Sequence, residues 1–339
     1  MNIKELTSET SYVLDSVAPA MPCEAVGSLV QKYQKSPRRR HRYCFHQNPN
    51  VDLHDIIICY DSTSYIPPNK HIDKIESLLV IDGELDFFLF NDLGQVYDYR
   101  RLGPSDSTYP FYVRVPSNTW HGLRAVGTKP CVIKETIAGP YDLLSLRWAS
   151  FAPNESEGNI IGNSWYDEIL EQCIRKGICS PADEVYEQIT DTVFRSTRQL
   201  VTVSLKQLQP IIIEAESTSL KRARLCCHDG PQDKLQEMFI ALASGVNIEE
   251  SFHLRKDESL TVIGGNGRYI FPNEDGTIRK EISLNSYGDP EDIQGNFFAR
   301  INRYVPHKII IEKSYLLIHE ATSGPFLKSD TDYRIKGVN

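Results

Sequence analysis

The sequence lacks the features that mark several broad classes of protein. No stretch approaches the eighteen consecutive apolar residues of a membrane-spanning helix. The opening residues, MNIKELTSETSYVLD, contain no apolar core like that of a signal peptide. The eight cysteines are scattered without a CxxC pair, which is typical of free thiols in a reducing compartment. We therefore expect a cytoplasmic protein that does not enter a membrane.

Two further absences concern charge and phosphate binding. Lys and Arg number 37 against 45 Asp and Glu, and the net charge of −8 argues against general nucleic-acid binding. No phosphate-binding glycine loop is evident, because the "GGNG" at residues 264–267 lies at a predicted hairpin and not between a strand and a helix. We expect a small-molecule substrate as the partner, with a homodimer as one option for the assembly.

The composition is that of a globular protein with a substantial core. The chain has 339 residues, of which 40% are hydrophobic and 10% aromatic. This length suits two ordinary domains or one large one. Charged residues make up a normal 24%, which argues against disorder.

An internal repeat resolves the choice between one domain and two. A shift of 182 residues brings residues 40–83 onto 222–265 without a gap, and 17 of the 44 positions are identical, where chance gives about three. The identical positions include Arg40/Arg222, Arg42/Arg224, Cys44/Cys226, His46/His228, His71/His253, Lys74/Lys256 and Glu76/Glu258. Further on, "ETIAGPY" aligns with "EATSGPF", and a single-residue deletion brings His121 onto His307. The chain is therefore a tandem duplication of one domain.

Each copy has the pattern of a β-sandwich or barrel. Residues 77–81 and 85–90 are apolar runs separated by the hairpin signal Asp82-Gly83, and residues 91–94 form a further turn signal. The second copy repeats this at residues 260–263, Gly264-Gly265 and Asp275-Gly276. Helical patterns are confined to the approaches, at residues 24–34, 164–175, 182–194 and 203–213.

These patterns give a domain plan. We expect a first domain at residues 1–155 with its core at about 38–141. A helical linker follows at 156–196. The second domain takes residues 197–339, with its core at about 220–326. The boundary between the first domain and the linker lies in the Pro/Asn/Ser/Gly-rich stretch at 152–162.

The repeated histidines and glutamate are candidate metal ligands. Two neutral imidazoles and a carboxylate form the ligand set of non-haem iron sites, and the set also suits zinc, nickel or manganese. His71 and Glu76 are five residues apart, so Glu76 needs a bulge or bend to join the face that carries His71. Any one of them could be a surface or hydrogen-bonded residue. Their joint recurrence as His253, Glu258 and His307 favours two sites, each with its three side chains close together.

A second repeated pattern is an alternating arginine strand. Arg40, Arg42, Cys44 and His46 alternate in the basic run "RRRHRYCFH", and the second copy reproduces the alternation. This indicates one face of a strand and not a nucleic-acid-binding patch. Two interpretations stay open: an edge that forms salt bridges, or an anion pocket, because guanidinium groups suit phosphate and carboxylate. His46 is a candidate to line this pocket, and the unrepeated His54 has a structural or accessory role.

At this point the motifs resemble a known family. In order along the first half they are "SPRRRHRYCFH", "SYIPPNKHIDKIES", "DGELDFFLFNDLG", "VPSNTWHGL", "ETIAGPY" and "WASFAPNE". They resemble the WbuC-type cupins, small metalloproteins often associated with clusters for O-antigen and other surface polysaccharides. The resemblance covers nearly all of the first half, and the second half looks like a diverged copy. It implies a mainly β protein with two tandem cupin domains, each a double-stranded β-helix or jelly roll with short flanking helices.

The resemblance also implies a ligand set for each domain. The ligands fall on Asn69, His71, Glu76 and His121 in the first domain, and on Ser251, His253, Glu258 and His307 in the second. The chain departs from the family pattern at Asn69 and Ser251, where the family has the first of two neighbouring histidines. An asparagine oxygen can ligate a hard metal, whereas a serine hydroxyl is a poor ligand. We therefore expect the second site to be the weaker one.

The function expected from these residues is metal-assisted chemistry on a small anionic or sugar-derived metabolite. The cofactor is a divalent ion such as Fe, Zn, Ni or Mn. Arg40, Arg42, His46, Tyr65 and Trp120 are the candidate substrate-binding residues, and His46 and Asn69 the catalytic candidates. One alternative is a metal-free nucleotide-sugar isomerase or epimerase with a histidine base. The other is a non-catalytic binding protein with altered metal sites.

Overall fold

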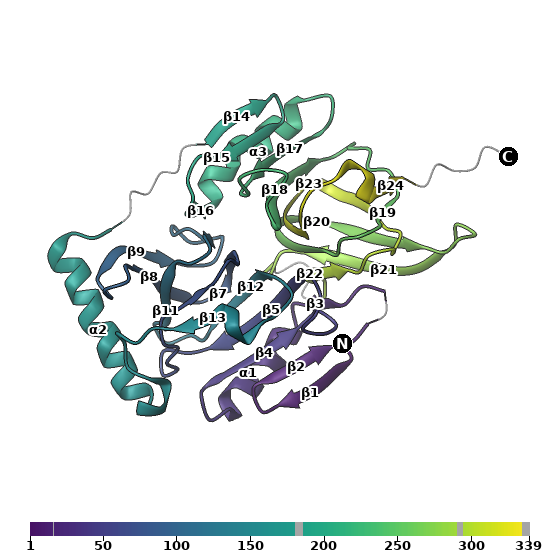
Figure 1. Ribbon diagram of the computed structural model, residues 1–339. Coiled ribbons are helices and arrows are strands. Elements are labelled where there is room, and N and C mark those ends of the chain that lie inside the picture. The colour runs from purple at the N-terminus through teal and green to yellow at the C-terminus, as the bar shows by residue number, and fades with distance from the viewer. Residues whose placement is uncertain (16, 180–185, 290–293, 334–339) are drawn as a thin grey trace.

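The computed structural model describes residues 1–15, 17–179, 186–289 and 294–333 (Figure 1). Within these ranges the chain is mainly β, with three α-helices and a few short 3-10 turns. All eight cysteines lie within these ranges and none is joined in a disulfide, as the scattered pattern predicts. The two tandem cupin domains expected from the repeat are present, the first in purple to teal and the second in green to yellow (Figure 1).

Two sheets form the first domain. The larger sheet contains, in order, β1 (Ile3–Thr7), β2 (Thr10–Val13), β4 (Arg40–Cys44), β5 (Leu53–Tyr60), β12 (Cys131–Ala138), β7 (Glu76–Asp82), β10 (Tyr112–Val115) and β16 (Val201–Val203). The smaller sheet contains β13 (Leu146–Trp148), β6 (Asn69–His71), β11 (Trp120–Val126), β8 (Glu84–Phe90) and β9 (Val96–Leu102). Apolar side chains from both sheets, such as Leu78 and Phe87, pack between them in one core cluster.

The second domain repeats this plan with longer strands. Its main sheet contains, in order, β14 (Tyr186–Thr190), β15 (Val193–Ser196), β17 (Arg222–Cys226), β18 (Leu235–Ala243), β23 (Lys308–Ser323), β20 (Glu258–Pro272), β21 (Ile278–Asn285), β22 (Asn296–Ile301) and β3 (Ala20–Pro22). A separate pair joins β19 (Ser251–His253) to β24 (Thr331–Tyr333). The long strands β20 and β23 each span the length that two strands cover in the first domain.

The two domains exchange one short strand each. The β3 strand, which precedes the first domain's barrel in the chain, pairs with β22 of the second domain through Met21 and Phe298. Its counterpart β16 pairs with β10 of the first domain through Thr202 and Val113. Because each barrel completes its sheet with a strand from the other copy, the two barrels form one structural unit.

Buried charges also cross between the two domains in matched pairs. The carboxylate of Asp55 in β5 accepts hydrogen bonds from Ser259 and Arg300 of the second domain. In the mirror arrangement, the carboxylate of Glu237 in β18 accepts from Ser77 and Arg114 of the first domain. Both acids are fully buried.

The helices cover the sheets as the apolar spacing predicts. Helix α1 (Ala25–Lys35) buries Val26, Leu29 and Tyr33, which recur every three to four residues and so lie on one face. Helix α3 (Leu205–Ser217) buries the equivalent positions against β17 and β18. Helix α2 (Asn159–Lys176) lies against the outside of the first domain (Figure 1). The helices predicted around residues 24–34, 164–175 and 203–213 are confirmed.

The helix predicted at residues 182–194 is wrong. Residues 182–185 lie outside the described ranges, and the rest of the segment forms β14 and β15. Among the described residues of the expected 156–196 linker, the α-helix is α2. The hairpin repeats β1 and β2 of the first domain, and β15 pairs with β17 as β2 pairs with β4. Its β-branched and aromatic residues favour a strand once a neighbouring edge is available for pairing. The remaining domain boundaries stay predictions.

The hairpin predicted at Asp82-Gly83 is also wrong. Strands β7 and β8 belong to different sheets and do not pair, so Gly83 marks the corner where the chain passes between the sheets. Gly83 has a φ of 75°, and a Cβ there would lie 2.5 Å from the carbonyl oxygen of Pro130. Gly265 has the same φ within the continuous strand β20. The turns predicted at 91–94 and 275–276 are true hairpin turns.

Candidate functional site

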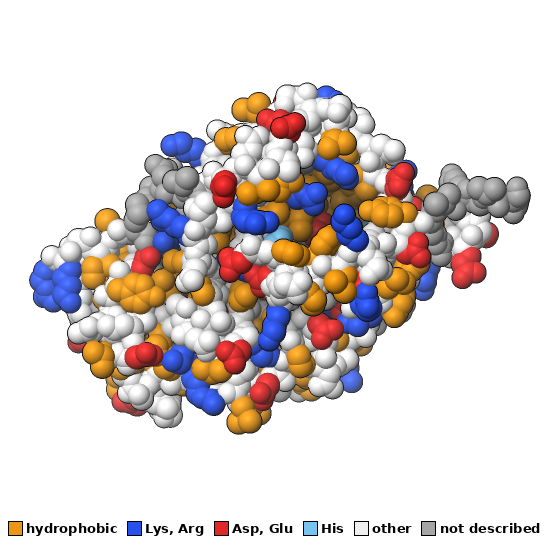
Figure 2. All heavy atoms as spheres, turned by 45° about the horizontal axis from the view of Figure 1, so that its top comes forward, with side chains coloured by type: hydrophobic (Ala, Val, Ile, Leu, Met, Phe, Trp, Pro, Cys, Tyr) orange, Lys and Arg blue, Asp and Glu red, His pale blue; other side chains and the backbone are white. Residues whose placement is uncertain are grey.

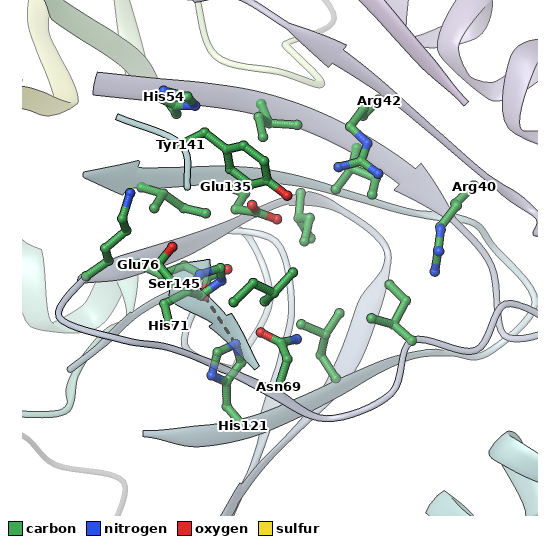
Figure 3. Close-up of a pocket in the computed structure, with 18 of the residues that line it drawn as sticks. Arg40, Arg42, His54, Asn69, His71, Glu76, His121, Glu135, Tyr141 and Ser145 are labelled. Carbon is green, nitrogen blue, oxygen red and sulfur yellow. Dashed lines mark ion pairs between the residues drawn. The ribbon is translucent and has the colours of Figure 1, made fainter. Parts of the chain in front are cut away.

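The predicted convergence of His71, Glu76 and His121 is confirmed. The Nε2 atoms of His71 and His121 lie 3.3 and 3.1 Å from the same oxygen, Oε2, of Glu76. Figure 3 shows the three side chains together at the floor of a cavity. His71 ends β6, Glu76 begins β7 and His121 lies in β11, so three strands supply one side chain each.

The local chain path explains how residues at such spacing meet. Asn69 is paired with His121 across β6 and β11, which places the two strands of the site side by side. Between His71 and Glu76 the chain turns at Asp73, whose φ of 55° is in the left-handed region. This is the bend that the five-residue spacing requires.

The electrostatics of the first site fit a bound cation. Burial would raise the pKa of the Glu76 carboxyl, but the adjacent His121 and His71 outweigh it and hold that pKa below its ordinary value. Oε2 of Glu76 is buried, and no hydrogen bond of good geometry reaches it from the described residues. The Nδ1 of His121 lies 3.1 Å from the carbonyl oxygen of Thr119, to which it can donate, leaving the Nε2 lone pair facing Glu76. A buried carboxylate oxygen and an oriented imidazole are what a metal ion would need here.

The second site repeats the arrangement. His253, Glu258 and His307 offer ligand atoms that all lie within 4.8 Å of one another, a group that could hold a metal ion. Oε2 of Glu258 is 2.7 Å from His253 and 3.9 Å from His307. Despite burial, these two histidines and a hydrogen bond from Tyr269 lower the pKa of Glu258 to about 2. His307 Nδ1 lies 2.9 Å from the carbonyl oxygen of Val305, matching Thr119 in the first site.

The first cavity has a volume of about 270 Å³ and a mixed lining. Apolar walls come from Ile56, Ile58, Ile66, Leu123, Ile133 and Ile137. Asn69 lines the cavity together with His71, as expected for positions i and i+2 of one strand. Tyr141 and Trp148, each about half exposed, also line it.

The two candidate arginines of the first cavity differ. Arg40 is buried, forms an ion pair with Glu155 and donates to the carbonyl of Tyr65, so the salt-bridge interpretation holds for it. Arg42 also lines the cavity, but no hydrogen bond or ion pair of its guanidinium occurs in the described part of the chain. Arg42 is therefore the arginine that an anionic ligand could reach.

Three predicted substrate residues lie elsewhere. His46 is behind the cavity wall, stacked on His54 at 4.1 Å, and burial together with His54 lowers its pKa to about 3. Of this stacked pair it is His54, expected to have a structural or accessory role, that lines the cavity. Tyr65 packs against Tyr166 of α2, and its hydroxyl donates to a backbone carbonyl. Trp120 precedes His121 in β11, so it points to the opposite side of the strand, where its indole donates to Asp92.

A partly buried carboxyl group in each cavity was missed. Glu135 of β12 lines the first cavity, and burial, together with the charge of Glu76, raises its pKa to about 8. Glu320 occupies the matching place in the second cavity, where burial and Glu258 raise its pKa to about 7. The signal was present in the sequence, because "ETIAGPY" and "EATSGPF" both begin with this glutamate.

Comparisons with known proteins support the fold. A family model described as a domain of unknown function, DUF6016, matches residues 23–102 and 203–284, once in each repeat. No curated protein matches the chain. The WbuC-type family is not shown by these comparisons, nor is a link to polysaccharide biosynthesis.

Among solved structures, the chain is similar to salicylate 1,2-dioxygenase from Pseudaminobacter salicylatoxidans, with 12% identity and a TM-score of 0.61 over 98% of this chain and 90% of that one. A mutant of that enzyme in complex with gentisate is 12% identical, with a TM-score of 0.61 over 99% of this chain and 89% of that one. The formate complex of an oxalate decarboxylase from Lactobacillus farciminis is 10% identical, with a TM-score of 0.46 over 98% of this chain and 90% of that one. At these identities the likeness to the dioxygenase establishes the two-cupin fold and not the reaction.

None of the helices in the described ranges has the length and apolar character needed to cross a membrane.

Proposed function

We propose that the first barrel is the centre of a metal-dependent enzyme acting on a small anionic metabolite. The observation that carries the proposal is the approach of two imidazole Nε2 atoms, at 3.3 and 3.1 Å, to one buried carboxylate oxygen at the cavity floor. His71, Glu76 and His121 would hold the ion, and Asn69 would add a weak ligand or a hydrogen bond to the substrate. A divalent ion held there supplies Lewis-acid polarisation of a bound oxygen.

The chain's own residues would bind and orient the substrate. Arg42 presents a guanidinium without an internal partner, so it can pair with a carboxylate or phosphate of the substrate. The isoleucine walls keep water away from the remainder of the ligand and strengthen this charge interaction. Glu135, whose carboxyl pKa is raised to about 8 in the metal-free chain, is the candidate proton donor.

The size of the cavity limits the substrate. A volume of about 270 Å³ suits a small metabolite and not a polymer or a large nucleotide sugar. This favours the small anionic compound over the larger sugar-derived one among the substrates expected from the sequence.

Metal analysis of protein purified without added metal tests the proposal. Wild type should contain a divalent ion, and His121→Ala should bind it about 10–100-fold more weakly. His54→Ala is the matched control, because His54 lines the same cavity outside the ligand trio, and it should retain the metal. A protein free of metal, with no affinity for zinc or iron, would rule out the metal centre and favour the isomerase alternative.

A further inference from the structure

The second cavity contains a buried lysine that forms no ion pair with the described residues, although the Glu320 carboxyl group of the same lining lies within range of its charge. Lys256 is only 7% exposed and lines the cavity, and no ion pair of its ammonium group occurs in the described residues. Its Nζ lies 5.0 Å from the centre of the Phe326 ring. A cation–π contact offsets part of the cost of removing an ammonium group from water, but an anion would offset more. In the first domain the equivalent Lys74 donates to the carbonyl of Pro140.

The arginines of the second cavity are also free. Arg222 and Arg224 of β17 line the cavity and are exposed, and neither side chain has a hydrogen bond or ion pair in the described part of the chain. Their counterparts differ, because Arg40 is neutralised by Glu155. The first domain thus has one unpaired arginine where the second has two.

Two further lysines, Lys308 and Lys328, complete the basic lining. Neither forms an ion pair within the described residues. The acidic groups of the same lining are the ligand-type Glu258, the partly buried Glu320 and the exposed Glu249. Figure 2 shows a face of the molecule on which Lys and Arg side chains gather around a hollow. The cavity, at about 840 Å³, is larger than the first at about 270 Å³.

We propose that the second barrel binds a small organic anion with at least two negative charges, held by Lys256, Arg222 and Arg224. Guanidinium groups bind carboxylate or phosphate oxygens through paired N–H donors, and the buried ammonium group adds a point charge. Five basic side chains around one cavity favour a multiply charged ligand over a monovalent one. The proposal concerns the second cavity and stands apart from the enzyme activity proposed for the first.

Calorimetric titration of the full chain at constant ionic strength tests the proposal. The probes are inorganic phosphate and succinate, which separate a phosphate preference from a carboxylate preference, with acetate as the monovalent comparison. We expect phosphate or succinate to bind more tightly than acetate. Arg224→Gln and Lys256→Gln should each weaken that binding by about tenfold, since each removes a charge-assisted contact.

Two controls make the result specific. Arg279→Gln removes one charge from an exposed site of the same domain outside the cavity and should leave the binding unchanged. Arg42→Gln removes the arginine proposed to hold the substrate of the first cavity, so binding that this variant abolishes belongs to the first cavity and not to the second. Arg224 is exposed, so its variant remains informative even if Lys256→Gln fails to fold. The proposal would be overturned if neither phosphate nor succinate bound. It would also be overturned if Arg224→Gln and Arg279→Gln lost affinity equally, or if only Arg42→Gln lost affinity. Metal content measured on the same samples distinguishes a failure of anion binding in the second cavity from a failure of the metal centre proposed for the first.

Discussion

The two barrels carry the same three ligand-type side chains but surround them with different walls. In both, a backbone carbonyl, from Thr119 or Val305, orients the distal histidine. In the first barrel, Glu155 neutralises the outer arginine and isoleucines enclose a small cavity. In the second, the arginines are unpaired and the cavity is about three times larger. Duplication has thus kept the centre of the site while its walls diverged, and the walls select the ligand.

The largest expected effect concerns the contact between the barrels. Arg300 is fully buried and pairs with both Asp55 and Asp257. Arg300→Met leaves these two acids without their shared cation, so the free energy of unfolding should fall by about 3–5 kcal/mol. The matched Arg114→Met should cost a similar amount, because the side chains of its two acids, Glu237 and Asp233, are also buried. Urea denaturation measures both.

The exposed Arg279→Met is the control for these variants and should change stability by no more than about 0.5 kcal/mol. Small losses for both Arg300→Met and Arg114→Met would mean that the crossed charges do not hold the barrels together.

The second prediction compares the two metal-type sites. His71→Ala should weaken metal binding by about 10–100-fold, because it removes an imidazole from the better ligand set. His253→Ala should act mainly on folding, at about 1–3 kcal/mol, because it deprives the buried Glu258 of its 2.7 Å partner. Metal content and thermal stability of both variants, measured side by side, check this. Loss of metal in His253→Ala alone would make the second barrel the functional metal centre.

The third prediction concerns the departures from the family pattern. Asn69→His places a neutral imidazole beside His71 in the first cavity and should raise metal affinity by about tenfold. Ser251→His should raise it in the second, because Ser251 also lines its cavity. Titration of metal-stripped protein with zinc or iron gives both affinities. Unchanged affinity in Asn69→His would show that position 69 does not contribute to the centre.

The sequence predicted the centre of the site better than its walls. The trio followed from repetition, because three side chains that recur at matching spacing are constrained together. The prediction that His46 lines the cavity is wrong because β4 ends at Cys44. The alternation that directs Arg40 and Arg42 into the cavity therefore stops before His46. Strand β5 instead supplies His54, Ile56, Ile58 and Tyr60 at every second position.

The alternation of β5 could have been read from the sequence only if its pairing with β4 had been known, and that pairing depends on tertiary contacts. The same dependence on tertiary contacts explains why Tyr65 was wrongly predicted to bind the substrate. Its burial depends on α2, a helix about a hundred residues away in the chain. The exchange of β3 and β16 between barrels was equally hidden, because three-residue strands leave no periodic pattern.

The last prediction separates two partly buried glutamates, Glu135 and Glu320, by the pH dependence of stability. The pKa of Glu135 is raised from 4.5 to about 8 in the folded chain, chiefly by burial. Its neutral form is therefore favoured by folding, and this stabilisation is complete below pH 4.5 and lost as the pH rises through about 8. In metal-stripped protein, wild type should lose stability relative to Glu135→Gln by at most about 1.4 kcal/mol per pH unit across this window. Glu320→Gln should show a narrower window that closes near pH 7, since the pKa of Glu320 is raised to about 7. Urea denaturation at pH 5, 6, 7 and 8 measures both windows, and parallel curves for wild type and Glu135→Gln would show that this carboxyl group is ionised in the folded protein.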